Sequence, residues 1–185
     1  MPPTGHTAAW EAELGLDSGE LDRRMHDVWR GGSLGTVSEP EVHAALTERL
    51  ALSPADLERF LAGLWEEYCG SLNVELTEWF AGLRPRYRTG IVSNSFVGAR
   101  EKEQERYGFE DLTDTMVYSH EVGVRKPDPA IYRLALDRLG VQPAEAVFLD
   151  DKELAVDGAR AVGMAAVQFR DNAQAIAEIE ALLAG

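Results

Sequence analysis

Residues 146–169 read AVFLDDKELAVDGARAVGMAAVQF. The pattern predicts a strand over 146–149, a helix over 154–162 that stops at Gly163, and a second strand over 165–169. Strands and helices that alternate over short links are typical of a parallel sheet covered by helices. This stretch therefore assigns the second half of the chain to the α/β class.

The same alternation extends upstream to residue 88 and downstream to the end of the chain. The pattern adds strands over 89–93 and 115–119 and helices over 97–107, 129–139 and 173–183. In sheets of this kind, ligands bind at the carboxyl ends of the strands. Polar residues that follow the predicted strands are therefore the candidates for a functional site.

The first half of the chain has a different pattern and reads almost wholly as helices. Ser38 and Glu41 have the spacing of a capping box at the start of one helix. Gly31, Gly32 and Gly35 are expected to break the helix before it. All tryptophans lie in this half, as expected for anchors of a small helical core: Trp10, Trp29, Trp65 and Trp79. The sequence thus predicts a helical unit over 8–84 and an α/β unit over 85–185.

Composition excludes several classes of protein. The 185 residues carry a formal net charge of −14, which argues against unassisted binding to nucleic acid or to anionic membranes and is compatible with cation binding. Cys69 is the single cysteine, so an intrachain disulfide is impossible. The sequence contains neither a signal-peptide pattern nor a run of about 18 apolar residues that could span a bilayer. A cytoplasmic protein is expected.

Three polar clusters are the candidates for chemistry. The first is Ser93-Asn94-Ser95, which follows a predicted strand and leads into a helix. A hydroxyl group and backbone N–H groups at such a junction can bind a phosphate group. Taken alone, this triplet is more often a helix N-cap.

The second cluster centres on Lys126, in the loop GVRKPDP over residues 123–129. The flanking prolines fix the position of this lysine, and a fixed ammonium group can neutralise a phosphate oxygen and a nearby carboxylate together. The alternative for this residue alone is a solvated loop lysine before a helix that Pro129 initiates.

The third cluster is Asp150-Asp151, which directly follows an apolar strand. Adjacent acids at a strand end are unfavourable unless a cation offsets them. Hard oxygen ligands of this kind suit Mg²⁺. The alternative is a helix N-cap followed by an acid that the helix dipole favours.

In this order and spacing, the three clusters resemble the haloacid-dehalogenase-like (HAD) hydrolase superfamily. The Ser-Asn-Ser triplet is similar to its phosphate-binding second motif, RKPDPAIY to its lysine loop, and FLDD to its acidic metal motif. The resemblance covers residues 88–169 closely, and the helical unit looks like the small helical cap of the family. The most similar subgroup contains the amino-terminal phosphatase domain of epoxide hydrolases and the 2-haloacid dehalogenases.

The resemblance implies a HAD-like Rossmannoid parallel sheet and a set of site roles. Ser93 and Lys126 are implied to be catalytic, and together with Asn94 they would hold the phosphoryl oxygens. Asp150 and Asp151 would hold Mg²⁺. The implied partner is a small phosphorylated molecule, with no nucleic acid or membrane, and a homodimer is an open option.

The chain departs from the family pattern at the first motif, an apolar strand ending in Asp-x-Asp that carries the nucleophile. Asp17, Asp22 and Asp27 lie in helical context, and none of them follows an apolar strand. Asp111 and Asp114 lie in a turn between elements. A smaller departure is Ala155, at a position where the subgroup often has Asn. We therefore expect the chain as given to be inactive.

In the family, the missing strand lies mid-sheet, between the strands that end here at Ser93 and Asp150. Its absence would leave two edges with unpaired backbone groups. Three outcomes are open: the half-sheets close up, a partner chain fills the gap, or the chain is a shortened version of a longer protein, which is the preferred interpretation.

Two functions from different classes are compatible with the sequence. The first is a Mg²⁺-dependent, phosphatase-type hydrolase whose nucleophile strand is missing from the chain. The second is a catalytically inactive HAD-like protein that binds or regulates, with its signature being ligand binding without turnover. A fortuitous α/β domain without a HAD-type site is a third interpretation, which the order of the three clusters disfavours.

Overall fold

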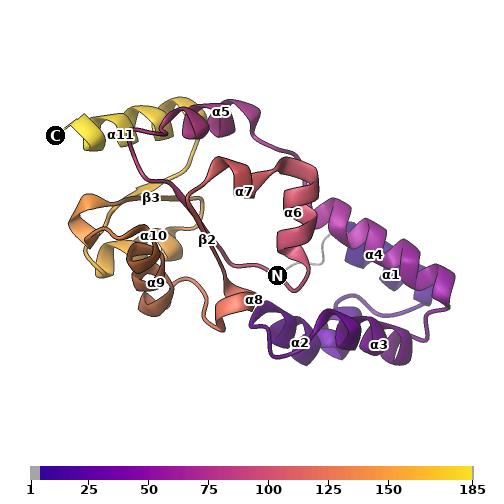
Figure 1. The fold of residues 1–185 in the computed structure, drawn as a ribbon. Coiled ribbons are helices and arrows are strands. Elements are labelled where there is room, and N and C mark those ends of the chain that lie inside the picture. Colours follow the sequence, from indigo (N-terminus) through magenta and orange to yellow (C-terminus); the bar gives the residue numbers. More distant parts are fainter. Residues whose placement is uncertain (1–4, 185) are drawn as a thin grey trace.

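The structure, a computed structural model, describes residues 5–184 and separates a group of helices from the strand-containing part (Figure 1). The helical group consists of α1 (Gly5–Leu14), α2 (Glu20–Ser33), α3 (Glu39–Leu50) and α4 (Pro54–Cys69). The capping box expected at the start of α3 is confirmed, because both the backbone N and the Oγ of Ser38 donate to Glu41 Oε2, at 2.7 and 2.6 Å.

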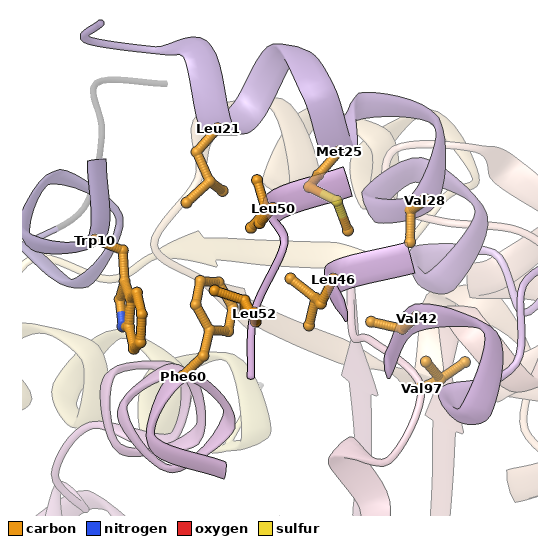
Figure 2. Close-up of a cluster of buried hydrophobic side chains, with 10 residues drawn as sticks. All are labelled: Trp10, Leu21, Met25, Val28, Val42, Leu46, Leu50, Leu52, Phe60 and Val97. Carbon is orange, nitrogen blue, oxygen red and sulfur yellow. The ribbon is translucent and has the colours of Figure 1, made fainter. Parts of the chain in front are cut away.

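These helices enclose an apolar core, shown in Figure 2. Trp10 is its largest buried member at 6% exposed, and Phe60, Leu21, Met25 and Leu46 are each no more than 1% exposed. Val97, from the loop after the first strand, joins the same cluster and ties the helical group to the α/β part. Burial of this apolar surface is the main stabilising contribution of the helical group.

The prediction that Gly31, Gly32 and Gly35 break a helix is wrong for the first two, whereas Gly35 does follow the end of the helix. α2 continues to Ser33, and both glycines are buried inside it. A Cβ atom at Gly31 would lie 2.3 Å from Val37 Cγ2, and one at Gly32 would lie 2.3 Å from Phe96 Cε2. The glycines therefore allow close packing on a helix that tertiary contacts stabilise despite its low helix propensity.

A single-residue test of this packing is Gly32→Ala. Because the added methyl group would overlap the Phe96 ring, the free energy of unfolding should fall by about 1–3 kcal/mol. Gly82→Ala is the matched control in another helix, since nothing lies within 4 Å of a Cβ at that position. Urea unfolding of the three proteins measures the difference, and equal stabilities would contradict the packing role of Gly32.

The α/β part contains all the strands of residues 5–184, and each predicted strand is found within one residue of its expected bounds. Its elements are α5 (Val74–Gly82), β1 (Gly90–Ser93), α6 (Ala99–Tyr107), α7 (Phe109–Leu112), β2 (Thr115–Tyr118), α8 (Ser119–Val122), α9 (Pro129–Leu139), η1 (Pro143–Glu145), β3 (Val147–Asp150), α10 (Glu153–Ala161), β4 (Ala165–Gln168) and α11 (Asn172–Ala184).

The strands form two parallel pairs rather than one continuous sheet. β1 pairs with β2, with Ile91 opposite Met116, and β3 pairs with β4, with Phe148 opposite Ala166. No hydrogen-bonded ladder joins β1 to β3 within residues 5–184. The two half-sheets have therefore not closed up, which excludes the first of the three outcomes considered for the missing strand.

Helix α5 packs against α11 at the other end of the chain (Figure 1). Asn73 Nδ2 donates to Asn172 Oδ1 at 2.7 Å, and Trp79 Nε1 donates to Glu180 Oε1 at 3.3 Å. The units over 8–84 and 85–185 stay a prediction, but this packing groups α5 with the α/β part.

The expectation that all four tryptophans anchor the helical core is only partly met. Trp10 belongs to the cluster of Figure 2. Trp29 is partly buried and packs against that cluster, whereas Trp65 packs against a separate cluster around Ala99 and Tyr118. Trp79 faces α11 instead, as its bond to Glu180 shows. None of the helices between residues 5 and 184 is long and apolar enough to cross a membrane.

Candidate active site

The site lies at the carboxyl ends of β1 and β3. There the Ser-Asn-Ser triplet, through Asn94, and the acidic pair, through Asp150, both contact Lys126. Lys126 Nζ lies 2.6 Å from Asp150 Oδ2 and donates to the backbone oxygen of Val92 at 2.7 Å. The lysine therefore bridges the ends of the two half-sheets. Parallel strands place their carboxyl ends at one edge, which is why residues so distant in sequence converge here.

The Lys126–Asp150 ion pair is largely shielded from water. The two side chains are 13% and 8% exposed, respectively. Lys126 Nζ also lies 5.6 Å from the centre of the Phe148 ring, within range of a cation–π interaction. A shielded ion pair costs desolvation energy, so removal of one partner leaves an uncompensated charge.

Asn94 holds the lysine loop rather than presenting its amide to an open site. Its Oδ1 accepts from the backbone N of Lys126 at 2.7 Å, and its Nδ2 donates to the Lys126 carbonyl at 3.0 Å. Both polar atoms of the side chain are thus engaged with the backbone of one residue. In this arrangement Asn94 positions Lys126, a role that the sequence triplet alone did not indicate.

The two adjacent acids have different surroundings. Asp150 uses both oxygens, because its Oδ1 accepts from the backbone N of Lys152 at 2.8 Å while Oδ2 contacts Lys126. Asp151 has a side chain that is 61% exposed, and its Oδ2 lies 2.8 Å from Lys152 Nζ. The hydrogen bond from Lys152 holds the pKa of the Asp151 carboxyl below its usual range, so this group is ionised at neutral pH.

The serines of the triplet have separate environments. Ser93 ends β1 half-buried beside the hydroxyl of Tyr68, a phenol whose pKa is raised above its usual range by burial. Ser95 is only 3% exposed, and its Oγ lies 2.7 Å from His120 Nδ1. Ser93 therefore lies at the strand end, near the site, whereas Ser95 makes a buried contact with His120.

The Ser95–His120 contact was not foreseen from the sequence, in which His120 has no partner at a recognisable spacing. Burial lowers the pKa of the His120 imidazole, although Glu121 acts in the opposite direction. The two residues are 25 positions apart and meet because β1 and β2 are neighbours. Their spacing in sequence carries no signal of this contact.

A cavity of about 410 Å³ adjoins the site between the helical group and the end of β1. Asn94 and Ser95 lie at its inner edge. The rest of its lining is rich in aromatic side chains, among them Trp29, Phe60, Trp65, Tyr68 and Phe96. Such a pocket suits the apolar or aromatic part of a small molecule.

The carboxylates at the site could hold a magnesium ion only together with water and phosphate oxygens of a bound ligand. Within residues 5–184, no three His, Cys, Asp or Glu side chains cluster as a metal site. Mg²⁺, however, usually keeps several waters and binds through one or two carboxylates plus phosphate oxygens of a substrate. Asp151, with Asp150 beside it, fits that pattern because its carboxylate is ionised and accessible.

Comparison with known proteins gives the family of this chain. Residues 9–163 match the family model of the haloacid dehalogenase-like hydrolases. Because this match spans more than half of the chain, the chain belongs to that family. The resemblance drawn from the three sequence clusters is thereby confirmed.

Several curated relatives share parts of the sequence. Bifunctional epoxide hydrolase 2 of Rattus norvegicus is 34% identical over 115 residues, which cover 60% of this chain and 21% of that protein. Fructose-1-phosphate phosphatase YqaB of Escherichia coli is 26% identical over 167 residues, covering 89% of this chain and 87% of that protein. The chain thus spans about a fifth of the length of the rat enzyme but most of the length of the bacterial one.

Solved structures share the fold. A HAD family enzyme from Bacteroides thetaiotaomicron, crystallised with magnesium and inorganic phosphate, superimposes with a TM-score of 0.78 at 16% identity, covering 95% of this chain and 91% of that one. L-2-haloacid dehalogenase from Xanthobacter autotrophicus gives a TM-score of 0.57 at 21% identity, covering 94% and 68%. The α/β HAD-like fold predicted from the sequence is therefore confirmed.

Proposed function

We propose that this chain supplies the phosphate- and metal-binding part of a phosphatase-type HAD site, and that its ligand is a small phosphorylated molecule. The observation that carries the proposal is the Lys126 ammonium group, fixed between Val92 O and Asp150 Oδ2 at the shared strand ends. A cation held in place before a ligand arrives stabilises phosphate charge without reorganisation. The relatives that are named as phosphatases support the same chemistry.

Each site residue has a distinct role in this proposal. Lys126 and Ser93 contact the phosphoryl oxygens and are the catalytic residues. Asn94 and Asp150 hold the lysine through its backbone and its ammonium group. Asp151 binds Mg²⁺ next to Asp150, and the ion would neutralise part of the phosphate charge when bound.

The organic part of the ligand would occupy the aromatic cavity that adjoins Asn94 and Ser95. Its aromatic lining, which includes Trp29 and Trp65, favours a phosphate ester with an apolar or aromatic group. The acids Asp22 and Glu67 in the same lining disfavour a second anionic group.

We further infer that the aspartate nucleophile of the parent reaction lies outside residues 5–184. The parent reaction requires an aspartate oxygen to attack phosphorus and water to hydrolyse the resulting acyl phosphate. Asp150 is the acid in contact with Lys126, and both of its oxygens are already engaged. The same observation favours the second candidate function, an anion-binding protein without turnover.

The variant Asp151→Asn tests whether Asp151 binds Mg²⁺. Mg²⁺ should strengthen the binding of inorganic phosphate to the 185-residue chain. The substitution should remove most of that gain because a neutral amide is a weaker ligand for a hard cation. Isothermal titration with and without Mg²⁺ measures the gain.

Asp157→Asn is the matched control, since Asp157 is an exposed acid on α10 that pairs with Arg160. If both variants keep the full effect of Mg²⁺, Asp151 is not the metal ligand. If Mg²⁺ has no effect on the unmodified chain, the metal part of the proposal is wrong.

A further inference from the structure

The aromatic cavity between the helical group and the end of β1 has walls built from two pairs of rings. Trp29 of α2 meets Phe96, in the loop after β1, edge to face with ring centres 5.7 Å apart. Trp65 and Tyr68 of α4 meet in the same way, with ring centres 5.3 Å apart. The four side chains are only partly buried, so they present ring surface to a molecule that enters the cavity.

The lining of the aromatic cavity also contains acids without a matching base. Among the described residues that line it, Asp22 and Glu67 are acidic, and none is Lys, Arg or His. The face of an aromatic ring is the negative end of its quadrupole, so rings and carboxyl groups attract the same kind of ligand group. The cavity is therefore complementary to a cation.

Asp22 has no cation of its own in the part of the chain that the structure describes. Its side chain is partly buried on α2, and its carboxyl group forms no ion pair there. The two arginines that follow it are engaged elsewhere, because Arg23 donates to the Ser18 carbonyl at 3.4 Å and Arg24 pairs with Glu20. Coulombic attraction is stronger where water is partly excluded, so this carboxyl group would stabilise a cation that enters the cavity.

The aromatic cavity continues to the proposed phosphate-binding lysine. Asn94 lies at its inner edge and bonds to the backbone N and O of Lys126, at 2.7 and 3.0 Å. Glu67 lies on the helical side, where its Oε2 accepts from the backbone N of His6 at 2.9 Å and so joins α4 to α1. A small ligand with its phosphate group at Lys126 would therefore extend its organic part between the rings.

We propose that the aromatic cavity binds an alkylated ammonium group, and that the ligand of the site is the phosphate monoester of an amino alcohol. The phosphate end of this ligand rests on the proposed function, whereas the ammonium end rests on the cavity alone. Methyl groups on nitrogen give an apolar surface that packs on the rings of Trp29 and Trp65, and the positive charge is attracted to the ring faces and to Asp22. A neutral alkyl group would have only the first of these two contributions.

The test compares choline with its neutral carbon isostere, in which a tert-butyl group replaces the trimethylammonium group, and compares the phosphate monoesters of both. Within each pair the two compounds have the same shape and differ in the positive charge. NMR titrations of the 185-residue chain with Mg²⁺ measure the four affinities. Each ammonium compound should bind about tenfold or more tightly than its isostere. The indole N–H signals of Trp29 and Trp65 should shift, and that of Trp79, which bonds to Glu180 on α11, should not.

Two variants connect the preference for the ammonium compounds to the aromatic cavity. Asp22→Asn keeps the shape of the side chain and removes its charge, so the preference should fall by about threefold or more. Asp137→Asn is the matched control, because Asp137 is an exposed acid on α9 that does not line the cavity, and it should leave the preference unchanged. Circular dichroism of both variants establishes that they are folded.

The ammonium site and the phosphate site can fail separately. Lys126→Gln/Asp150→Asn should remove the affinity that the phosphate group adds and keep the preference for choline over its isostere. If choline is preferred but the phosphate group adds no affinity to the unmodified chain, the ammonium site stands and the proposed phosphate site is wrong. Equal binding of choline and its isostere, or binding of none of the four compounds, would overturn the inference. A preference that is undiminished in Asp22→Asn, or a signal that shifts at Trp79 instead, would also overturn it.

Discussion

The 185-residue chain should hydrolyse p-nitrophenyl phosphate at no more than about a millionth of the rate of a version with an added upstream strand that ends in Asp-x-Asp. The physical reason is that both acids after β3 have other roles in the proposed site. Lys126 would hold the phosphoryl group, whereas Asp150 pairs with that lysine and Asp151 would hold Mg²⁺. Steady-state assays of both proteins with Mg²⁺ measure the ratio.

The control is a version whose added strand ends in Asn-x-Asn, which keeps the strand and removes the nucleophile. It should be as inactive as the short chain. If the short chain turns over and Lys126→Ala abolishes that activity, a nucleophile exists within the chain and the proposed function is wrong in this respect.

Lys126→Met should be the most destabilising single substitution at the site, lowering the free energy of unfolding by about 3–5 kcal/mol. The substitution leaves the Asp150 carboxylate, whose side chain is 8% exposed, without its cation. It also removes the donor to Val92 O that ties the two half-sheets together. Urea unfolding followed by circular dichroism measures the loss.

Two further variants distinguish the contribution of the Lys126–Asp150 ion pair to stability from the effect of changing a residue in the same loop. Arg125→Met changes the exposed cation next to Lys126 and should change stability by less than about 0.5 kcal/mol. The double variant Lys126→Met/Asp150→Leu removes both charges and should recover most of the loss, because a buried ion pair can often be replaced by apolar groups. A double variant as unstable as the single one would contradict the ion-pair explanation.

The elements of the α/β part could be predicted because their signals are local. Short apolar runs, a proline at the start of α9 and glycines after α9 and α10 set bounds that the structure reproduces closely. The rule that parallel strands end at one edge also predicted that the Ser93 triplet and Asp150 lie at the same end of the strands. The place of Lys126 beside Asp150 was implied only by the family resemblance, because Lys126 lies in a loop and not at a strand end.

The features that the sequence did not reveal all depend on long-range packing. The glycines of α2 look like helix breakers until Phe96 is placed against Gly32. The bonds of Asn94 to Lys126 span 32 positions, and the contact of Ser95 with His120 spans 25. A local pattern can identify a phosphate-binding triplet, but it cannot show that one of its side chains is already occupied by the neighbouring loop.

The separation of the strands into two pairs could be predicted from the sequence only in part. The sequence indicated that a central strand was missing, but it left open whether the half-sheets would close up. They remain apart in the structure, and apolar side chains of helices α5, α9 and α11 line the space between them. Closure would require those helices to move together with their strands.

Isothermal titration of inorganic phosphate into the 185-residue chain, with Mg²⁺ present, is the decisive test of Lys126 as a fixed phosphate-binding cation. We expect binding that is lost in Lys126→Gln/Asp150→Asn, a neutral pair of similar shape, and retained in the control Arg125→Gln. Circular dichroism of the three proteins establishes that each is folded. Phosphate binding that is unchanged in the double variant would contradict the role of Lys126 as the phosphate-binding cation.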